Sequence, residues 1–150
     1  MNTIDPQKAA RVWQRVQGAA QPSDRELLTM LSAEWTNAAT YLQLSRQFQG
    51  RDSAALRKLY EAEQAHTACL KGIYTLITGT RPVVKATPLA GTDPEALLRR
   101  CYGRAMQALA DYEARMNDKE YGPVFARLAD QEKEHCHTIL ELIGNLKNGR

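Results

Sequence analysis

Apolar residues recur every three or four positions along most of this chain, and the alternation typical of strands is nearly absent. Four long segments carry this helical period, and they begin at Ser23, near Asp52, at Thr92 and at Gly122. The first and third open with capping boxes, Ser23 to Glu26 and Thr92 to Glu95. The pattern predicts an all-α protein built from four long helices of similar length.

The connections between these segments predict how the helices are joined. Gly50 and Gly79 stop the first two periodic segments. Residues 80–91 contain two prolines and no sustained period, which predicts a long extended connection between the second and third helices. Such a connection lets the third helix run parallel to the second, so we expect a four-helix bundle with a long crossover.

The N-terminal residues form a separate short helical pattern from Asp5 to about Gln17. Its small apolar edge predicts that it packs on the bundle or on a neighbouring subunit. We therefore divide the chain into an N-terminal helical extension, residues 1–22, and a bundle, residues 23–150.

Composition narrows the class of protein without naming a function. The chain has 150 residues, enough for one domain with its own core, and its net charge of +3 gives no argument for a nucleic acid partner. No apolar stretch approaches the about 20 residues of a membrane span, and no secretory signal is visible. The three cysteines form no C-x-x-C pair, which suits reduced thiols in the cytoplasm.

The informative positions are those where a charged or titratable residue interrupts an apolar stripe, because burying an unpaired charge is costly. In the first long segment, Glu34 is such a position. The second and fourth segments each carry Glu-x-x-His, as Glu63 with His66 and Glu132 with His135. This spacing places a carboxylate and an imidazole on one face of a helix, about one turn apart.

The two halves of the chain resemble each other. LYEAEQAH, residues 59–66, aligns with LADQEKEH, residues 128–135, at Leu, Glu and His. The first and third segments align with a shift of 71, which sets Tyr41 on Tyr112. We interpret the chain as two weakly preserved copies of a helical hairpin.

Carboxylates from different helices combined with Glu-x-x-His pairs are typical of the metal sites of ferritin-like bundles. Residues 23–147 resemble the rubrerythrin branch of the ferritin-like superfamily, through Glu34 with Tyr41 seven residues later and the two Glu-x-x-His motifs. The resemblance implies a site of two iron ions, for which Mn or Zn are chemically possible substitutes. The implied ligands are Glu34, Glu63, His66, Glu132 and His135. Tyr41 is either a core residue or a hydrogen-bond partner of a ligand carboxylate.

One position departs from the family. The third helix should supply a further glutamate, but the internal alignment places Ala105 opposite Glu34. Three carboxylates and two neutral imidazoles leave two divalent ions with a net charge of +1. We therefore expect the second ion to bind more weakly or to be completed by water or an exogenous anion, and Arg104 either worsens this deficit or holds the anion.

The resemblance implies a peroxide reductase of oxidative-stress defence. The chain lacks a rubredoxin-like cysteine site, so its electrons must come from a separate donor protein. Two alternatives remain: a non-enzymatic metal-binding or iron-handling protein with an incomplete site, and a metal-free helical interaction module built on a buried Glu–His network. We also expect a homo-oligomer, most simply a dimer.

Overall fold

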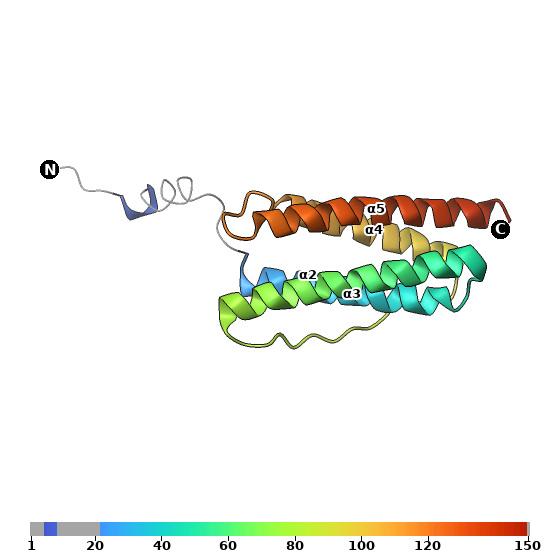
Figure 1. The fold of residues 1–150 in the computed structure, drawn as a ribbon, viewed down its shortest axis with the longest axis horizontal. Helices are drawn as coiled ribbons and strands as arrows, with labels where there is room; N and C mark the ends of the chain where they lie inside the picture. The colour runs from blue at the N-terminus through green and yellow to red at the C-terminus, as the bar shows by residue number, and fades with distance from the viewer. Residues whose placement is uncertain (1–4, 9–21, 150) are drawn as a thin grey trace.

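Four long helices make up most of the described protein (Figure 1). The computed structural model describes residues 5–8 and 22–149. Within these residues it contains no strand, so the predicted all-α class is confirmed. The helices are α2 (Asp24–Ser45), α3 (Gly50–Thr78), α4 (Pro94–Glu113) and α5 (Gly122–Lys147).

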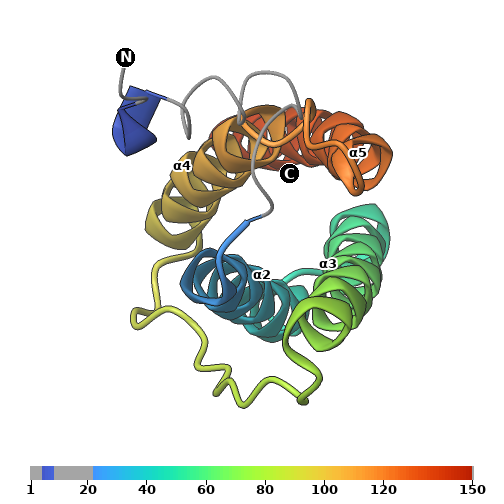
Figure 2. The same ribbon diagram turned by 90° about the vertical axis from the view of Figure 1, so that its left-hand side faces the viewer.

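The helices form two hairpins that pack against each other. α2 packs along α3, α4 packs along α5, and the hairpins meet through α2 with α4 and α3 with α5. The connection from residue 79 to residue 93 runs back along the length of the molecule, so α3 and α4 point in the same direction (Figures 1 and 2). The predicted long crossover is present.

The predicted capping residue Ser23 begins α2, whereas α4 is capped by Asp93, one residue after the predicted Thr92. The Ser23 hydroxyl accepts a hydrogen bond from the Glu26 backbone N–H at 3.1 Å, and the Asp93 carboxylate accepts one from Ala96 at the same distance. Both bonds satisfy backbone donors that a helix start leaves unpaired. Pro94 lies in the first turn of α4, where its missing N–H costs nothing.

Two helices end before apolar residues that continue their helical period. α2 ends at Ser45, so Phe48 lies beyond it, and α4 ends at Glu113, so Met116 lies outside the helix and is largely exposed. The buried Asp118 explains the second difference, because its carboxylate accepts hydrogen bonds from the backbone of Glu120 and Tyr121. These bonds stabilise a turn that competes with continuation of the helix.

Gly50 also has a different role from the one predicted. It is the first residue of α3 rather than the end of the preceding helix, and its φ of +60° is open to glycine at little cost. Of the predicted N-terminal helix, residues 6–8 are helical, and residues 9–17 lie outside the described part of the chain.

The apolar core consists of two clusters separated along the bundle axis. One includes Leu31, Leu70 and Leu128, and the other includes Tyr41, Leu59 and Ile139. On α2, α3 and α5 the interrupting acidic and histidine residues fall between members of the two clusters. A polar layer therefore crosses the middle of the bundle, with apolar packing on both sides.

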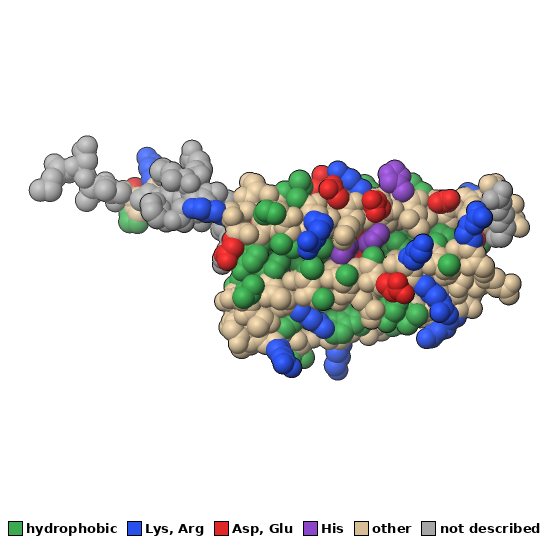
Figure 3. All heavy atoms as spheres, viewed as in Figure 1, with side chains coloured by type: hydrophobic (Ala, Val, Ile, Leu, Met, Phe, Trp, Pro, Cys, Tyr) green, Lys and Arg blue, Asp and Glu red, His purple; other side chains and the backbone are tan. Residues whose placement is uncertain are grey.

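The surface carries acidic and basic side chains mixed together on the face shown in Figure 3. That face shows no gathering of Lys and Arg of the kind that nucleic acid binding uses. Among the described residues, no helix has the length and apolar content that crossing a membrane requires.

Two glycines provide a test of packing. A Cβ at Gly122 would lie 2.5 Å from the Met116 carbonyl oxygen, whereas a Cβ at Gly103, inside α4, would meet nothing within 4 Å. We expect Gly122→Ala to lower the free energy of unfolding by about 1–3 kcal/mol through overpacking. Gly103→Ala should raise it by about 0.5–1 kcal/mol, because alanine favours a helix interior over glycine. Urea denaturation of both variants measures the difference, and equal effects would contradict the packing around Gly122.

Candidate metal centre

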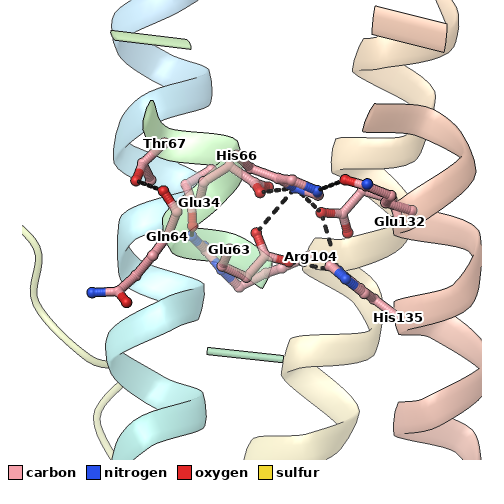
Figure 4. Close-up of polar contacts among 10 residues, drawn as sticks. Glu34, Glu63, Gln64, His66, Thr67, Arg104, Glu132 and His135 are labelled. Carbon is pink, nitrogen blue, oxygen red and sulfur yellow. Dashed lines mark hydrogen bonds and ion pairs between the residues drawn. The ribbon is translucent and has the colours of Figure 1, made fainter. Parts of the chain in front are cut away.

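Five acidic and histidine side chains from three helices converge in the polar layer (Figure 4). α2 contributes one, and α3 and α5 contribute one Glu-x-x-His pair each. All five are buried, with exposed fractions between 0% and 7%. We call this set the Glu/His cluster: Glu34, Glu63, His66, Glu132 and His135. The structure thus brings together all five residues that the family resemblance implies as ligands.

The cluster is tight enough for a single ion to reach several of its atoms. One donor atom from each of four residues lies within 4.8 Å of the others, and these residues are Glu63, His66, Glu132 and His135. Glu34 joins them through its Oε2, which accepts a hydrogen bond from His66 Nδ1 at 2.9 Å. On the opposite side, His135 Nδ1 lies 2.7 Å from Glu63 Oε1.

The two imidazole rings occupy equivalent positions of the two hairpins. They are stacked, with ring centroids 5.3 Å apart and an interplanar angle of 21°. His66 Nδ1 is also 3.2 Å from Glu132 Oε1, so the α3 histidine reaches the α5 carboxylate. This pairing across the hairpins supports the internal repeat inferred from the sequence.

Several carboxylate oxygens of the cluster have no hydrogen-bond partner. Four are buried in this way: Glu34 Oε1, Glu63 Oε2, Glu132 Oε1 and Glu132 Oε2. A buried acceptor without a partner costs free energy, and more so when it is charged. Oxygen atoms of this kind, beside two imidazole nitrogens, form a donor set that a divalent transition metal would satisfy.

Gln131 is a site residue that the sequence analysis missed. Its side-chain Oε1 accepts a hydrogen bond from His66 Nε2 at 2.6 Å. When Nε2 carries the proton, the neutral ring leaves Nδ1, the nitrogen that faces the carboxylates, free to bind a metal. The sequence offered no signal for it, because Gln131 falls outside the apolar stripe and its counterpart in the repeat is Ala62.

Tyr41 and Tyr112 lie on opposite sides of the cluster and are fully buried. Neither hydroxyl has a hydrogen-bond partner, and the ring of Tyr112 packs edge-on against His66 at 6.3 Å. Burial is the main cause that raises the pKa of Tyr41, and the negative charge of Glu63 adds to it. Burial likewise raises the pKa of Tyr112, with a further contribution from the charge of Glu34. Both hydroxyls therefore keep their protons and are available as donors.

The α4 side of the site has no carboxylate in the position that the family pattern predicts. Ala105 is completely buried, and its methyl group packs in the apolar cluster that contains Tyr41. Arg104, its neighbour, reaches across to α2, where its Nε donates to Asn37 Oδ1 at 2.7 Å and its Nη2 to the Ala33 carbonyl at 3.4 Å. The site is therefore asymmetric, with ligands on α2, α3 and α5.

Charges within the cluster are set by its close contacts between imidazole nitrogens and carboxylate oxygens. Burial favours the neutral ring of His66, but its contacts with Glu132, Glu34 and Glu63 outweigh burial and raise the pKa of His66 to about 12. Burial also opposes ionisation of Glu132, yet ion pairs with His135 and His66 hold the pKa of Glu132 at about 2. Without a metal, His66 is a cation and Glu132 an anion at neutral pH.

The other two carboxylates hold protons more tightly than usual. Burial raises the pKa of Glu63 to about 7, against hydrogen bonds from Glu34 and His66 that lower it. Burial and then the charge of Glu63 raise the pKa of Glu34 well above its ordinary value. In the absence of a metal, protons therefore compensate part of the negative charge that a cation would otherwise balance.

These shifts predict how the metal-free protein responds to pH. The pKa of Glu63 rises on folding from 4.5 to about 7, and that of His66 from 6.5 to about 12. Each group contributes stability that is fully present below its unfolded pKa and is lost as the pH rises through its folded pKa. We expect the Tm of metal-free protein to fall steadily from pH 6 to pH 9.

A bound metal should reverse this trend, because metal ligands must be deprotonated. The increase in Tm on adding Zn(II) should therefore grow over the same pH interval. Differential scanning calorimetry with and without Zn(II) measures both slopes. A metal-free Tm that rises between pH 6 and pH 9 would contradict the assigned protonation states.

No protein-family model, curated protein or solved structure matches this chain. What the structure establishes is an all-helical protein with a buried Glu/His cluster that could hold a metal ion, compatible with a ferritin-like di-iron fold.

Proposed function

We propose that this protein is a rubrerythrin-like member of the ferritin-like superfamily that binds iron in the Glu/His cluster and reduces hydrogen peroxide. The observation that supports it most is the set of four buried carboxylate oxygens without hydrogen-bond partners, beside the Nδ1 atoms of His66 and His135. Mixed carboxylate and imidazole donors suit Fe, Mn and Zn alike, so the donor set supports a transition metal and leaves its identity to experiment.

The arrangement of the helices supports the same assignment. Two hairpins joined by a long connection, with Glu-x-x-His on α3 and on α5, are what the ferritin-like architecture requires of its second and fourth helices. The capped start of α2 and its single glutamate in the polar layer match the first helix.

Two ions would bind this site unequally. Glu63, His66, Glu132 and His135 suffice for one ion, and Glu34 is the remaining carboxylate for a second. Three carboxylates against two divalent ions leave a net charge of +1, where a fourth carboxylate would give neutrality. We infer a tight first site and a weaker second site.

Two iron ions would supply the two electrons that cleave the O–O bond when one peroxide and two protons become two water molecules. The protein's own residues hold the ligands and exclude bulk water from a site that is almost fully buried. The hydroxyl protons of Tyr41 and Tyr112 lie beside the carboxylates and remain in place at neutral pH. In this proposal the electrons come from a separate donor protein.

The absence of an α4 carboxylate favours a second candidate function. Ala105 leaves the site one ligand short, as would suit a protein that binds or carries a metal without redox turnover. The two functions share their ligands and differ in the number of ions bound and in reaction with peroxide.

Anaerobic titration with Fe(II) distinguishes these functions. The peroxide reductase should bind about two ions per chain and show oxidation of the bound iron on adding one equivalent of hydrogen peroxide, followed by absorption spectroscopy. Saturation at one ion without reaction would select the metal-binding function. Protein that stays metal-free after loading with Fe, Mn and Zn would contradict both.

Two neighbouring histidines of α5 provide a matched test of the ligands. His135 is buried in the cluster, whereas His137 is exposed two residues later on the same helix. We expect His135→Ala to weaken binding of the first ion by more than about 10-fold, since even loss of an outer partner of a ligand has effects on that scale. His137→Ala should leave the affinity unchanged. Calorimetric titration with Zn(II) measures both, and equal affinities for the two variants would exclude His135 as a ligand.

A further inference from the structure

A small cavity lies beside the Glu/His cluster, between α2 and α4. Its volume is about 70 Å³, and Glu34, Arg104 and Tyr112 are among the residues that line it. This is more than the space of two water molecules in the liquid, about 60 Å³. The cavity therefore has room for a ligand of a few non-hydrogen atoms next to the carboxylate of Glu34.

Polar atoms of the cavity lining lack partners. Glu34 Oε1 and the Tyr112 hydroxyl are buried and make no hydrogen bond. Arg104 uses Nε and Nη2 on Asn37 and Ala33, and its Nη1 makes no hydrogen bond within the described residues. Arg104 and Tyr112 both line this space, and a guanidinium and a phenol hydroxyl are hydrogen-bond donors that suit an anionic oxygen ligand.

The same side of the site is where the repeat loses an acidic residue. Ala105 occupies the α4 position equivalent to Glu34, and Ala108 occupies the position equivalent to Asn37. Both alanines are buried; Ala108 lines the cavity, whereas Ala105, one turn away, packs in the apolar cluster that contains Tyr41. The short side chain of Ala108 leaves space on the α4 side of the site, which has no carboxylate of its own.

We propose that this cavity binds a small monocarboxylate such as formate or acetate, held by Arg104 and the Tyr112 hydroxyl, which takes the place of the missing fourth carboxylate. The inference rests on the proposed metal function, because the ligand's negative charge neutralises the +1 left by two divalent ions and three glutamates. Asp111 also lines the cavity and accepts a hydrogen bond from Gln107. Its negative charge disfavours an anion until cations occupy the cluster, so ion and anion bind cooperatively.

The experiment is Zn(II) titration by calorimetry in a non-coordinating buffer, with and without acetate, followed by the same titration with benzoate. Coupling between two sites is typically 5-fold to 150-fold in affinity. Acetate should increase the affinity for the second ion by a factor within about this range and leave the affinity for the first ion unchanged. Benzoate, too large for the cavity, should change neither affinity. In Mn(II)-loaded protein, relaxation of ¹³C-labelled acetate should show that the anion lies near the metal.

Two arginines of α4 give matched variants. Arg104→Gln should abolish the effect of acetate on the affinity for the second ion. Arg99→Gln is the control: it removes the same charge from an exposed side chain that pairs with Glu95, and the effect of acetate should persist. Ala105→Glu, which supplies a carboxylate from the protein, should tighten the second ion without acetate and remove the response to it. If that variant does not fold, the Arg104 and Arg99 pair decides.

The outcomes separate this inference from the proposed function. Two ions that bind with affinities independent of acetate would overturn the anion site and leave the metal centre standing. An acetate effect that persists in Arg104→Gln would overturn the role of this cavity. Wild-type protein that binds no metal in any buffer would overturn the proposed function, and the anion site with it.

Discussion

Burial of three carboxylates and two imidazoles in the middle of a helical bundle is the constraint on which the rest of the structure depends. Each unpaired charge removed from water carries a large cost, and four oxygens of the Glu/His cluster accept no hydrogen bond, although two of them lie within 3.6 Å of a histidine nitrogen. The apolar clusters on both sides keep water out and fix the depth of the polar layer. The capped helices, whose lengths are defined, then place the five side chains of the Glu/His cluster at the same depth along the bundle axis.

The metal-free cluster solves part of this problem with protons. The imidazolium of His66 lies within 3.6 Å of the carboxylates of Glu34, Glu63 and Glu132, and its positive charge balances part of their negative charge as a bound cation would. Metal binding would exchange these protons for a metal ion, so the affinity of the site and the stability of the fold depend on pH in opposite directions. Gln131 contributes to this exchange, because a proton held on His66 Nε2 leaves Nδ1 for the metal.

The sequence predicts the site well where a helical period determines which face a residue occupies. Glu34 and the two Glu-x-x-His pairs interrupt apolar stripes, so their burial follows from the period alone. Other features depend on contacts between helices, which a single sequence does not encode locally. Gln131 reaches His66 from another helix, and Arg104 bonds Asn37 67 residues away. The early end of α4 likewise depends on a local turn at Asp118 that the apolar pattern does not contain.

The two hairpins match at some positions of the internal alignment and differ at others, and the site is asymmetric where they differ. α3 and α5 keep the same Glu and His at the same depth, and their rings stack across the interface. α2 and α4 share leucine at Leu27 and Leu98, alanine at Ala39 and Ala110, and the two tyrosines, whereas Ala105 stands opposite Glu34 and Arg104 opposite Ala33. Replacing an acid and adding a base both shift the local charge in the positive direction. Both differences make the α4 side of the site more positive than the α2 side, and Arg104 also links the two helices through Asn37 and the Ala33 carbonyl, so its charge is held beside the cavity rather than extended into solvent.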